Sequence, residues 1–507
     1  MSNTPNYLSR RQFLKAGTCG SMTIGPLVNS IAQLSLVNTA SASVSYNHSD
    51  YKALVCIFLS GGADANNILI PRASHDLGEI YANERGIVGV ANGVNSADVT
   101  LPLEGTDCGL HPSLTHMQSL YNNGNLAFVT NVGTLAEPTL KESYDSTTLP
   151  KQLFSHSDQS TEWMSSIADQ PYTSGWGARV ADLYNSVWNP SADTTNKTSM
   201  LITASGANRL QGGGSNNQYS ITSSGAISLA GFGTNYSSAQ TTALDGTVSY
   251  YNNLKGRRLK ALEQIMQYSH AHIIEEGYSE VIRNARDNEE LVALAMEAQT
   301  NSGVDFDTLW AGATGGIADE LRIIATLIAG REKLGNNRQI FFVQMGGWDH
   351  HSLINSKLPS LLSELDSAIG AFDATMKELA SKDANFSYDQ VTTFNGSDFN
   401  RTFTPNKTSS DAGTDHAWGT HTFVMGGAVA GGTLYGEYPD LGVNSSVDVP
   451  SGSRGRWIPT TSVDQYSAVL ANWFGVPEGS SEMETIFPNL NRFTSPFTEE
   501  ANLRFFT

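Results

Sequence analysis

Apolar residues follow two alternating patterns along the chain. One is a helical spacing of apolar positions, which occurs at 110–123, 318–328 and 358–379. The other is a short and mostly apolar run, typical of a strand buried on both faces of a parallel sheet, and it occurs at 53–59, 126–132, 339–344 and 391–394. Strands that alternate with helices predict an α/β fold with a central, largely parallel sheet flanked by helices.

The composition changes in the middle of the chain. Residues 205–246 are rich in Gly, Ser, Asn and Thr and carry little charge, which predicts an irregular segment. Residues 254–300 mix apolar and charged residues at the spacing of one or two long amphipathic helices. A length of 507 residues suits two domains or one large α/β domain with an insertion. We expect a single domain at 43–507 with an insertion at about 205–300.

The first 42 residues are expected to be a signal peptide. The segment 9–15 (Ser-Arg-Arg-Gln-Phe-Leu-Lys) matches the twin-arginine export signature, and Ala40-Ser41-Ala42 is a small-residue cleavage site. We therefore predict export by the twin-arginine translocation machinery to the periplasm or the extracellular space. No later run reaches about 18 apolar residues, so no membrane-spanning helix is expected.

The charge and the cysteines limit the classes of function. A formal net charge of −19 argues against nucleic-acid binding, which depends on Lys and Arg at the phosphates. It suits an acidic solvated surface or the recruitment of cations. Cys56 lies in an apolar run, which predicts a reduced, buried thiol, and a Cys56–Cys108 disulfide is the alternative.

Side chains that suit a metal centre follow the predicted strands. Ligands of open α/β sheets bind beyond the carboxyl ends of the strands. Carboxylate oxygens suit hard divalent ions, and zinc also accepts neutral imidazole. Two cations about 4 Å apart, held by about six such ligands, can clamp both oxygens of an in-line displacement. The candidates are Asp64, Asp349, His350, His351, Asp398, Asp415, His416 and His421, with the choice between His350 and His351 left open.

The segment 154–159 (Phe-Ser-His-Ser-Asp-Gln) offers a nucleophile. Ser155 or Ser157 is either a helix cap or a nucleophile, because amides at a helix start favour a developing anion. Arg401 is the candidate for stabilising charge in the transition state. The sequence contains no phosphate-binding P-loop, no H-E-x-x-H zinc helix, no G-x-S-x-G elbow and no dinucleotide fingerprint.

Motifs spread over nearly the whole chain resemble the exported domain-of-unknown-function family 1501. That family is allied in fold to the alkaline phosphatase and sulfatase superfamily, so the resemblance implies an alkaline phosphatase-like sandwich and a two-metal site. Besides the twin-arginine start, the segments that carry the resemblance are 59–64 (Leu-Ser-Gly-Gly-Ala-Asp), 154–159, 346–351 (Gly-Gly-Trp-Asp-His-His), 397–399 (Ser-Asp-Phe), 413–416 (Gly-Thr-Asp-His) and 458–466 (Ile-Pro-Thr-Thr-Ser-Val-Asp-Gln-Tyr).

The resemblance also implies roles for single residues. Three positions depart from the family pattern, since Asn400, Ala417 and Thr420 stand where Gly is usual. The chain lacks a Cys-x-Pro-x-Arg element, which argues against a formylglycine sulfatase of the usual kind. By analogy, the metal ligands are Asp64, Asp349, Asp398 and His416, with His351 and His421 completing the shells and Ser157 or Ser155 as nucleophile.

These observations predict a metal-dependent hydrolase of phosphate or sulfate esters. It would bind two divalent metal ions (zinc, manganese or calcium) and act on a small ester or on a sulfated or phosphorylated glycan. One alternative is a non-catalytic exported binding or scaffold protein that retains the hydrolase fold. Another is a metal-independent hydrolase that uses a serine with His156 as its base.

Overall fold

The computed structural model describes residues 50–190, 198–227, 236–242, 248–266 and 288–507. The predicted signal peptide at 1–42 lies outside these residues, as do parts of the predicted insertion. Within the described part of the chain, no helix is both long and apolar enough to cross a membrane.

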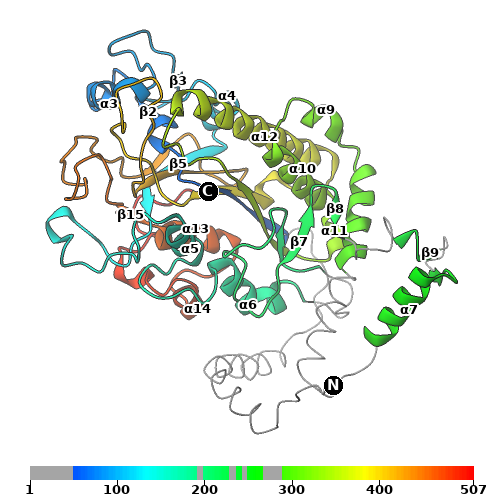
Figure 1. Cartoon of the computed structure of the whole chain (residues 1–507). Helices are drawn as coiled ribbons and strands as arrows, with labels where there is room; N and C mark the ends of the chain where they lie inside the picture. Colours follow the sequence, from blue (N-terminus) through cyan, green and yellow to red (C-terminus); the bar gives the residue numbers. More distant parts are fainter. Residues whose placement is uncertain (1–49, 191–197, 228–235, 243–247, 267–287) are drawn as a thin grey trace, which may run out of the picture.

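A ten-stranded mixed sheet forms the centre of the molecule (Figure 1). In spatial order its strands are β14 (Leu434–Gly436), β5 (Leu126–Gly133), β13 (Thr420–Gly426), β12 (Val391–Ser397), β1 (Lys52–Leu59), β11 (Arg338–Met345), β6 (Leu201–Thr203), β7 (Tyr219–Thr222) and β8 (Gly225–Ala226), while β15 (Thr461–Ser462) pairs with β5. β1 pairs in parallel with β11 and β12, and only β13 and β8 run antiparallel to their neighbours. The predicted largely parallel sheet is therefore confirmed.

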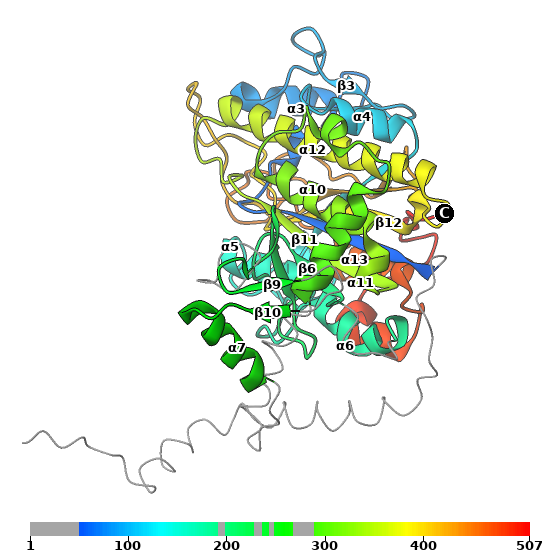
Figure 2. The same cartoon turned by 90° about the vertical axis from the view of Figure 1, so that its right-hand side faces the viewer.

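Alternate side chains of β1 explain why helices cover both faces of this sheet. Val55 and Ile57 join one apolar core, and Leu54, Cys56 and Phe58 join the other. Such a strand is apolar throughout because neither face meets water. The first core lies under α4 (Thr115–Asn122), α10 (Gly316–Ala329) and α12 (Ile354–Lys382). The second lies under α5 (His156–Ser165), α6 (Trp176–Trp188), α13 (Val463–Phe474) and α14 (Ser481–Ile486), and Figure 2 shows the sheet between these two layers.

The Gly/Ser-rich segment differs from its prediction. It was expected to be irregular, but it contributes β7 and β8 to the edge of the main sheet. The amphipathic segment forms α7 (Leu254–Met266) and a helix at 288–300, with 267–287 outside the described residues.

Smaller elements complete the described chain. They are the sheet β2 (Leu69–Pro71), β4 (Cys108–Leu110) and β3 (Leu101–Pro102), the hairpin β9 (Gln240–Thr242) and β10 (Val248–Tyr250), and the helices α3 (Gly78–Glu84), α9 (Phe306–Trp310) and α11 (Arg331–Leu334). The 3₁₀ turns are η2 (Ala65–Asn67), η3 (Gly86–Val88), η4 (Lys141–Ser143), η6 (Tyr388–Gln390) and η7 (Leu490–Arg492).

Both described cysteines are free and buried. Cys56 lies in β1 and Cys108 in β4, and no disulfide joins them. Burial raises the pKa of the Cys108 thiol to about 11. The prediction of a reduced thiol at Cys56 agrees with this arrangement.

The strand register brings the candidate loops to one edge of the sheet. Leu59 at the end of β1 is level with Met345 of β11 and Ser397 of β12. β13 runs the opposite way, so its first residue, Thr420, lies at the same edge. The segments that meet there are 60–64, 346–351, 398–401 and 413–419.

Candidate metal centre

Close contact between two strand-end loops shapes the site. Gly61 follows β1 with a φ of +120°, and a Cβ at this position would lie 2.6 Å from the backbone nitrogen of Asp349. Only glycine avoids both the left-handed strain and this clash. The amide of Gly61 also donates a hydrogen bond of 3.1 Å to Oδ2 of Asp398. The backbone therefore fixes the ends of β1, β11 and β12 relative to one another.

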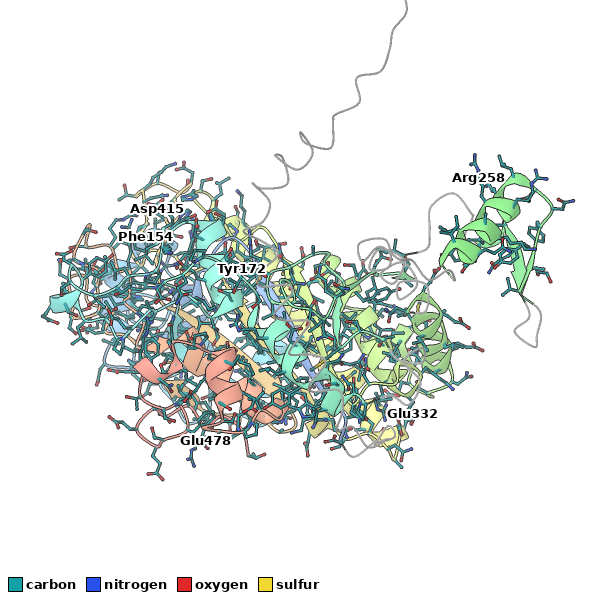
Figure 3. All side chains as sticks on the ribbon, turned by 90° about the horizontal axis from the view of Figure 1, so that it is seen from below. Phe154, Tyr172, Arg258, Glu332, Asp415 and Glu478 are labelled. Carbon is teal, nitrogen blue, oxygen red and sulfur yellow. The ribbon has the colours of Figure 1, made fainter. Side chains whose placement is uncertain are left out.

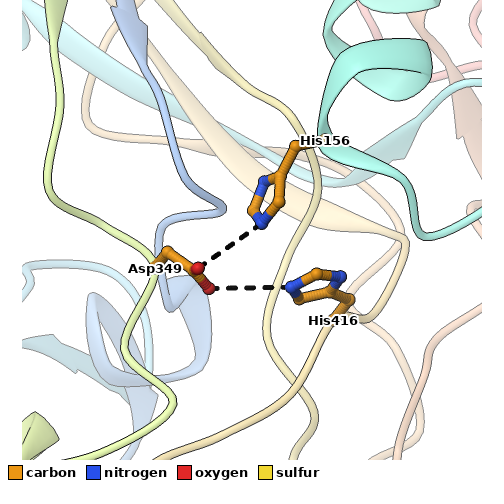
Figure 4. A group of neighbouring side chains, drawn as sticks. All are labelled: His156, Asp349 and His416. Carbon is orange, nitrogen blue, oxygen red and sulfur yellow. Dashed lines mark ion pairs between the residues drawn. The ribbon is translucent and has the colours of Figure 1, made fainter.

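Three imidazoles converge on the carboxylate of Asp349. Nε2 of His351 lies 3.0 Å from Oδ1, and Nε2 of His416 lies 3.6 Å from the same oxygen. Nε2 of His156 lies 3.7 Å from Oδ2, as Figure 4 shows together with His416. The Nε2 atoms of His351 and His416 are 3.0 Å apart. The Asp349 side chain is 45% exposed, so the cluster opens to solvent.

The partners of the other ring nitrogens define the tautomers. Nδ1 of His416 donates to the backbone carbonyl of Phe154 over 2.7 Å. Nδ1 of His156 lies 2.7 Å from Oδ2 of Asp398, and Nδ1 of His351 lies 2.9 Å from Oδ1 of Asp415. Because carbonyls and carboxylates accept hydrogen bonds, each Nδ1 carries a proton, and Nε2 is the ring nitrogen that faces Asp349.

This donor set suits a cation. Lone pairs that face one another and a carboxylate repel unless positive charge, either a proton or a metal ion, lies among them. Nε2 of His156 is buried and has no hydrogen-bond partner in the described part of the molecule. Three imidazole nitrogens and one carboxylate form a zinc-type ligand set, and acceptors on the opposite ring nitrogens are the usual support of such ligands.

Arginines pair with two carboxylates, Asp349 at the centre of the cluster and Asp415 behind His351. Nη1 of Arg401, which is fully buried, lies 2.8 Å from Oδ1 of Asp349. Burial raises the pKa of Asp349, but the hydrogen bond and charge of Arg401 prevail and lower it below its usual range. Burial likewise opposes ionisation of Asp415, but hydrogen bonds from Arg454 and His351 lower its pKa to about 2. Both carboxylates are therefore negatively charged at neutral pH.

Arg401 is already engaged within the protein. Besides Asp349, it donates to the carbonyl oxygen of Thr414 over 2.5 Å. Its position fits the orientation of the Asp349 carboxylate, whereas the sequence predicted that it would stabilise charge on a substrate.

Two of the predicted ligands lie away from the cluster. Asp64 forms an ion pair of 2.6 Å with Arg85, and both side chains are fully buried. His421 accepts a hydrogen bond from the backbone amide of Asn131 and stacks on Tyr438, and burial lowers its pKa to about 3. Among the described residues, neither Asp64 nor His421 makes a hydrogen bond or an ion pair with Asp349 or the three imidazoles.

Asp398 and the two serines surround the cluster. Oδ2 of Asp398 binds His156, so this predicted ligand acts through that imidazole, while its buried Oδ1 has no partner within the described chain. Ser155 and Ser157 both donate to Oδ2 of Asp158, over 2.6 and 3.1 Å. Ser155 immediately precedes α5, and the hydroxyl of Ser157 is on the exposed side.

Tertiary contacts identify ligands that the strand pattern did not. His156 comes from the start of α5 rather than from a strand end, and the sequence predicted it only as the base of a metal-independent mechanism. His350 is buried and neither ring nitrogen has a partner in the described chain, so His351 is the neighbour that faces the cluster. Among all described residues, one group offers three ligand atoms within 4.8 Å of one another, and its members are His156, Asp349 and His416.

Comparisons with known proteins give a family. The family model described as "Protein of unknown function (DUF1501)" matches residues 51–454. No curated protein matches the chain. A crystal structure of a mutant of alkaline phosphatase PafA aligns with a TM-score of 0.23 and 10% identity, over 71% of this chain and 64% of that one. The chain thus spans less than two thirds of that enzyme, and a likeness of this size supports no inference about activity.

Proposed function

The chain belongs to the DUF1501 family of proteins of unknown function, and we propose that it is a metal-dependent hydrolase of phosphate or sulfate esters. The observation that supports this proposal is the convergence of three Nε2 atoms on the Asp349 carboxylate at a solvent-exposed strand edge. Catalytic zinc needs a position for water or substrate and can expand to five ligands, and the exposed Asp349 side of the cluster leaves access for such a fifth ligand.

The ligands of the ion would be His156, His351, His416 and Asp349. When bound, the ion would supply Lewis-acid chemistry by polarising an ester oxygen of the substrate. Imidazole nitrogens favour zinc over calcium and manganese, which prefer oxygen ligands.

We propose one ion where the sequence predicted two. A second ion would need Asp64, but the guanidinium of Arg85 already neutralises that carboxylate inside the protein. Displacing a buried guanidinium would leave its charge without a partner, which is strongly unfavourable.

The proposed nucleophile is Ser157. Its hydroxyl is exposed beside His156 and donates to the carboxylate of Asp158. As the serine oxygen attacks the phosphorus or sulfur of the ester, Asp158 would take up the hydroxyl proton, and the bond to the substrate's alcohol oxygen would break. The alcohol would leave with that proton, and water would then hydrolyse the serine ester. Ser155 shares the same acceptor but is less exposed. The two hydroxyls share Asp158 as their acceptor and differ in their exposure to solvent. Replacing each serine by alanine in turn therefore tests which of them is the nucleophile.

Arg456 is the proposed anchor for the anionic group of the substrate. Its Nε donates to the carbonyl oxygen of His416, and its guanidinium lies 4.8 Å from the ring centre of Phe154. The terminal N–H groups of Arg456 have no acceptor within the described residues. An arginine fork of this kind matches two oxygens of a phosphate or sulfate.

The test starts with metal content. We expect about one zinc per chain after dialysis against metal-free buffer and reconstitution. His416→Ala should lose the metal, while His75→Ala, which removes a histidine outside the cluster, should retain it. Two ions per chain would refute the single-ion site, and none after reconstitution would refute the metal centre.

Turnover is measured next with aryl phosphate and aryl sulfate esters. We expect a chelator to abolish hydrolysis and zinc to restore it. Ser157→Ala should lower kcat by at least about 100-fold, whereas Ser155→Ala should retain most of it. An equal loss of kcat in both variants would refute the proposal that Ser157 is the nucleophile.

One observation favours a second candidate, a non-catalytic binding protein. Arg85 pairs with Asp64 and Arg401 pairs with Asp349, so arginines already neutralise two of the predicted ligand carboxylates. A protein that had lost its catalytic metal would need counter-ions of this kind. A protein that binds zinc but hydrolyses neither class of ester would support this candidate.

A further inference from the structure

A small helical arm stands apart from the sheet and its two helix layers. We define the basic arm as residues 236–242 and 248–266, which include β9, β10 and α7. Figure 3 shows α7, with Arg258 labelled, well away from the central part of the molecule. The arm has an apolar core of its own, formed by Tyr236, Ala239 and Leu259. Leu259 of α7 thus packs inside the arm itself, and the hydroxyl of Tyr236 ties the arm to the helix at 288–300 by a hydrogen bond of 2.5 Å to Glu289.

The outer face of α7 is a stripe of apolar residues. Leu254, Ala261 and Ile265 are exposed and lie on the side opposite the buried Leu259 and Gly256. Leu254 is 57% exposed and Ile265 is 53% exposed. Tyr251, just before the helix, is 40% exposed.

Cations flank this stripe. Lys255, Arg257, Arg258 and Lys260 are all exposed, and none of them has an ion-pair partner among the described residues. Glu263 is the one carboxylate in the sequence of α7. The arm is thus positive in a chain whose formal net charge is −19.

We propose that the basic arm binds an anionic lipid surface. An apolar stripe bordered by Lys and Arg is typical of helices that lie in the membrane interface, and an exposed Tyr suits the headgroup level. The surface of such a membrane repels the acidic body, but salt screens charges over about 10 Å at 0.1 M. Because the arm projects from the body, its cations can contact the lipid headgroups while the acidic body stays farther from the membrane.

The short helix predicts weak and salt-dependent binding. Two large apolar side chains bury little area, so attraction between the four cations and the headgroups decides affinity. A partner of opposite charge is required, and a neutral bilayer does not provide one. The proposal is independent of the metal centre, since no residue of the arm belongs to that cluster.

Vesicle co-sedimentation of the full-length chain tests the proposal. We expect binding to phosphatidylcholine vesicles that contain phosphatidylglycerol, little binding to phosphatidylcholine alone, and release at high salt. The variant Arg257→Gln/Arg258→Gln should bind roughly 30-fold more weakly, as loss of two juxtamembrane cations predicts. Leu254→Ser/Ile265→Ser should also weaken binding.

The control removes two exposed cations from the body. Lys333→Gln/Lys382→Gln changes the net charge equally and should bind as the parent does. Every variant retains residues 1–42, so differences from the parent report on the substituted positions. Unchanged binding of Arg257→Gln/Arg258→Gln, or equal binding to neutral vesicles, would overturn the proposal. A third outcome is that the parent binds no lipid but self-associates, and that Arg257→Gln/Arg258→Gln abolishes the self-association. The arm would then bind the acidic body of a second copy rather than a lipid surface, which would also overturn the proposal.

Discussion

The candidate site depends on which nitrogen of each histidine is free. A histidine binds a metal only through an unprotonated nitrogen, and hydrogen bonding at the opposite nitrogen decides which one that is. Here the acceptors are Asp398, Asp415 and the carbonyl of Phe154. At the scale of residues, these acceptors are as much part of the site as the four proposed ligands.

Asp398 gives the sharpest test of this view. Asp398→Asn retains the shape of the side chain but removes the charge that holds the Nδ1 proton of His156. We expect zinc affinity to fall about 10–100-fold, because supporting hydrogen-bond partners of metal ligands have effects of this size. Competition with a chromophoric chelator measures the Kd. The control is Asp411→Asn, at a carboxylate on the same loop whose side chain is 51% exposed. Equal affinity in both variants would contradict the role of Asp398.

Glu162 on α5 predicts how stability depends on pH. Burial, with a contribution from the charge of Asp158, raises its pKa from 4.5 to about 8, although hydrogen bonds from Gln159 and other neighbours oppose the shift. The folded state therefore binds this proton more tightly than the unfolded state does. The resulting stability is complete below pH 4.5 and is lost as the pH rises towards 8.

Urea unfolding at pH 5, 7 and 9 measures this effect. The free energy of unfolding of the parent should fall over the range, and Glu162→Gln, which has no charge to bury, should flatten the fall. Glu104→Gln, at an exposed position, should reproduce the parent. If the free energy of unfolding fell equally with pH in the parent and in Glu162→Gln, the buried carboxyl would not be the source of the pH dependence.

At the scale of elements, the loop after β1 positions the loop after β11. Gly61→Ala would place a Cβ 2.6 Å from the amide nitrogen of Asp349 and would force the two loops apart. We expect zinc affinity to fall by at least about tenfold, with a loss of stability of about 1–3 kcal/mol from strain at positive φ.

Gly105 provides the matched control for this substitution. It also has positive φ, at +75°, but a Cβ added there would have no heavy atom within 4 Å of it. Gly105→Ala should therefore be strained without changing zinc affinity. If both variants lowered affinity equally, backbone strain rather than contact with the Asp349 loop would be the cause.

At the scale of the whole molecule, the sheet could be predicted because its strands are buried on both faces. The run at 53–59 is apolar at every position since β1 faces a helix layer on each side. The gathering of Asp349 and Asp398 follows from parallel strands that end at one edge. The role of His156 depends on how α5 docks, and the partner of Asp64 is Arg85, just beyond α3. No local pattern encodes either contact.

The proposed ligands also link distant parts of the chain, which predicts the effect of metal on global stability. His156, Asp349 with His351, and His416 lie on three separate segments, so unfolding disperses them and the unfolded chain has no comparable site. An ion that binds only the folded state at a free concentration of about 100 times its Kd adds about 2.7 kcal/mol to stability. Removal of zinc by a chelator should therefore lower the Tm of the parent. It should leave the Tm of His416→Ala unchanged, because that variant has lost its ion already. A Tm that falls equally in both proteins would place the stabilising ion elsewhere in the molecule.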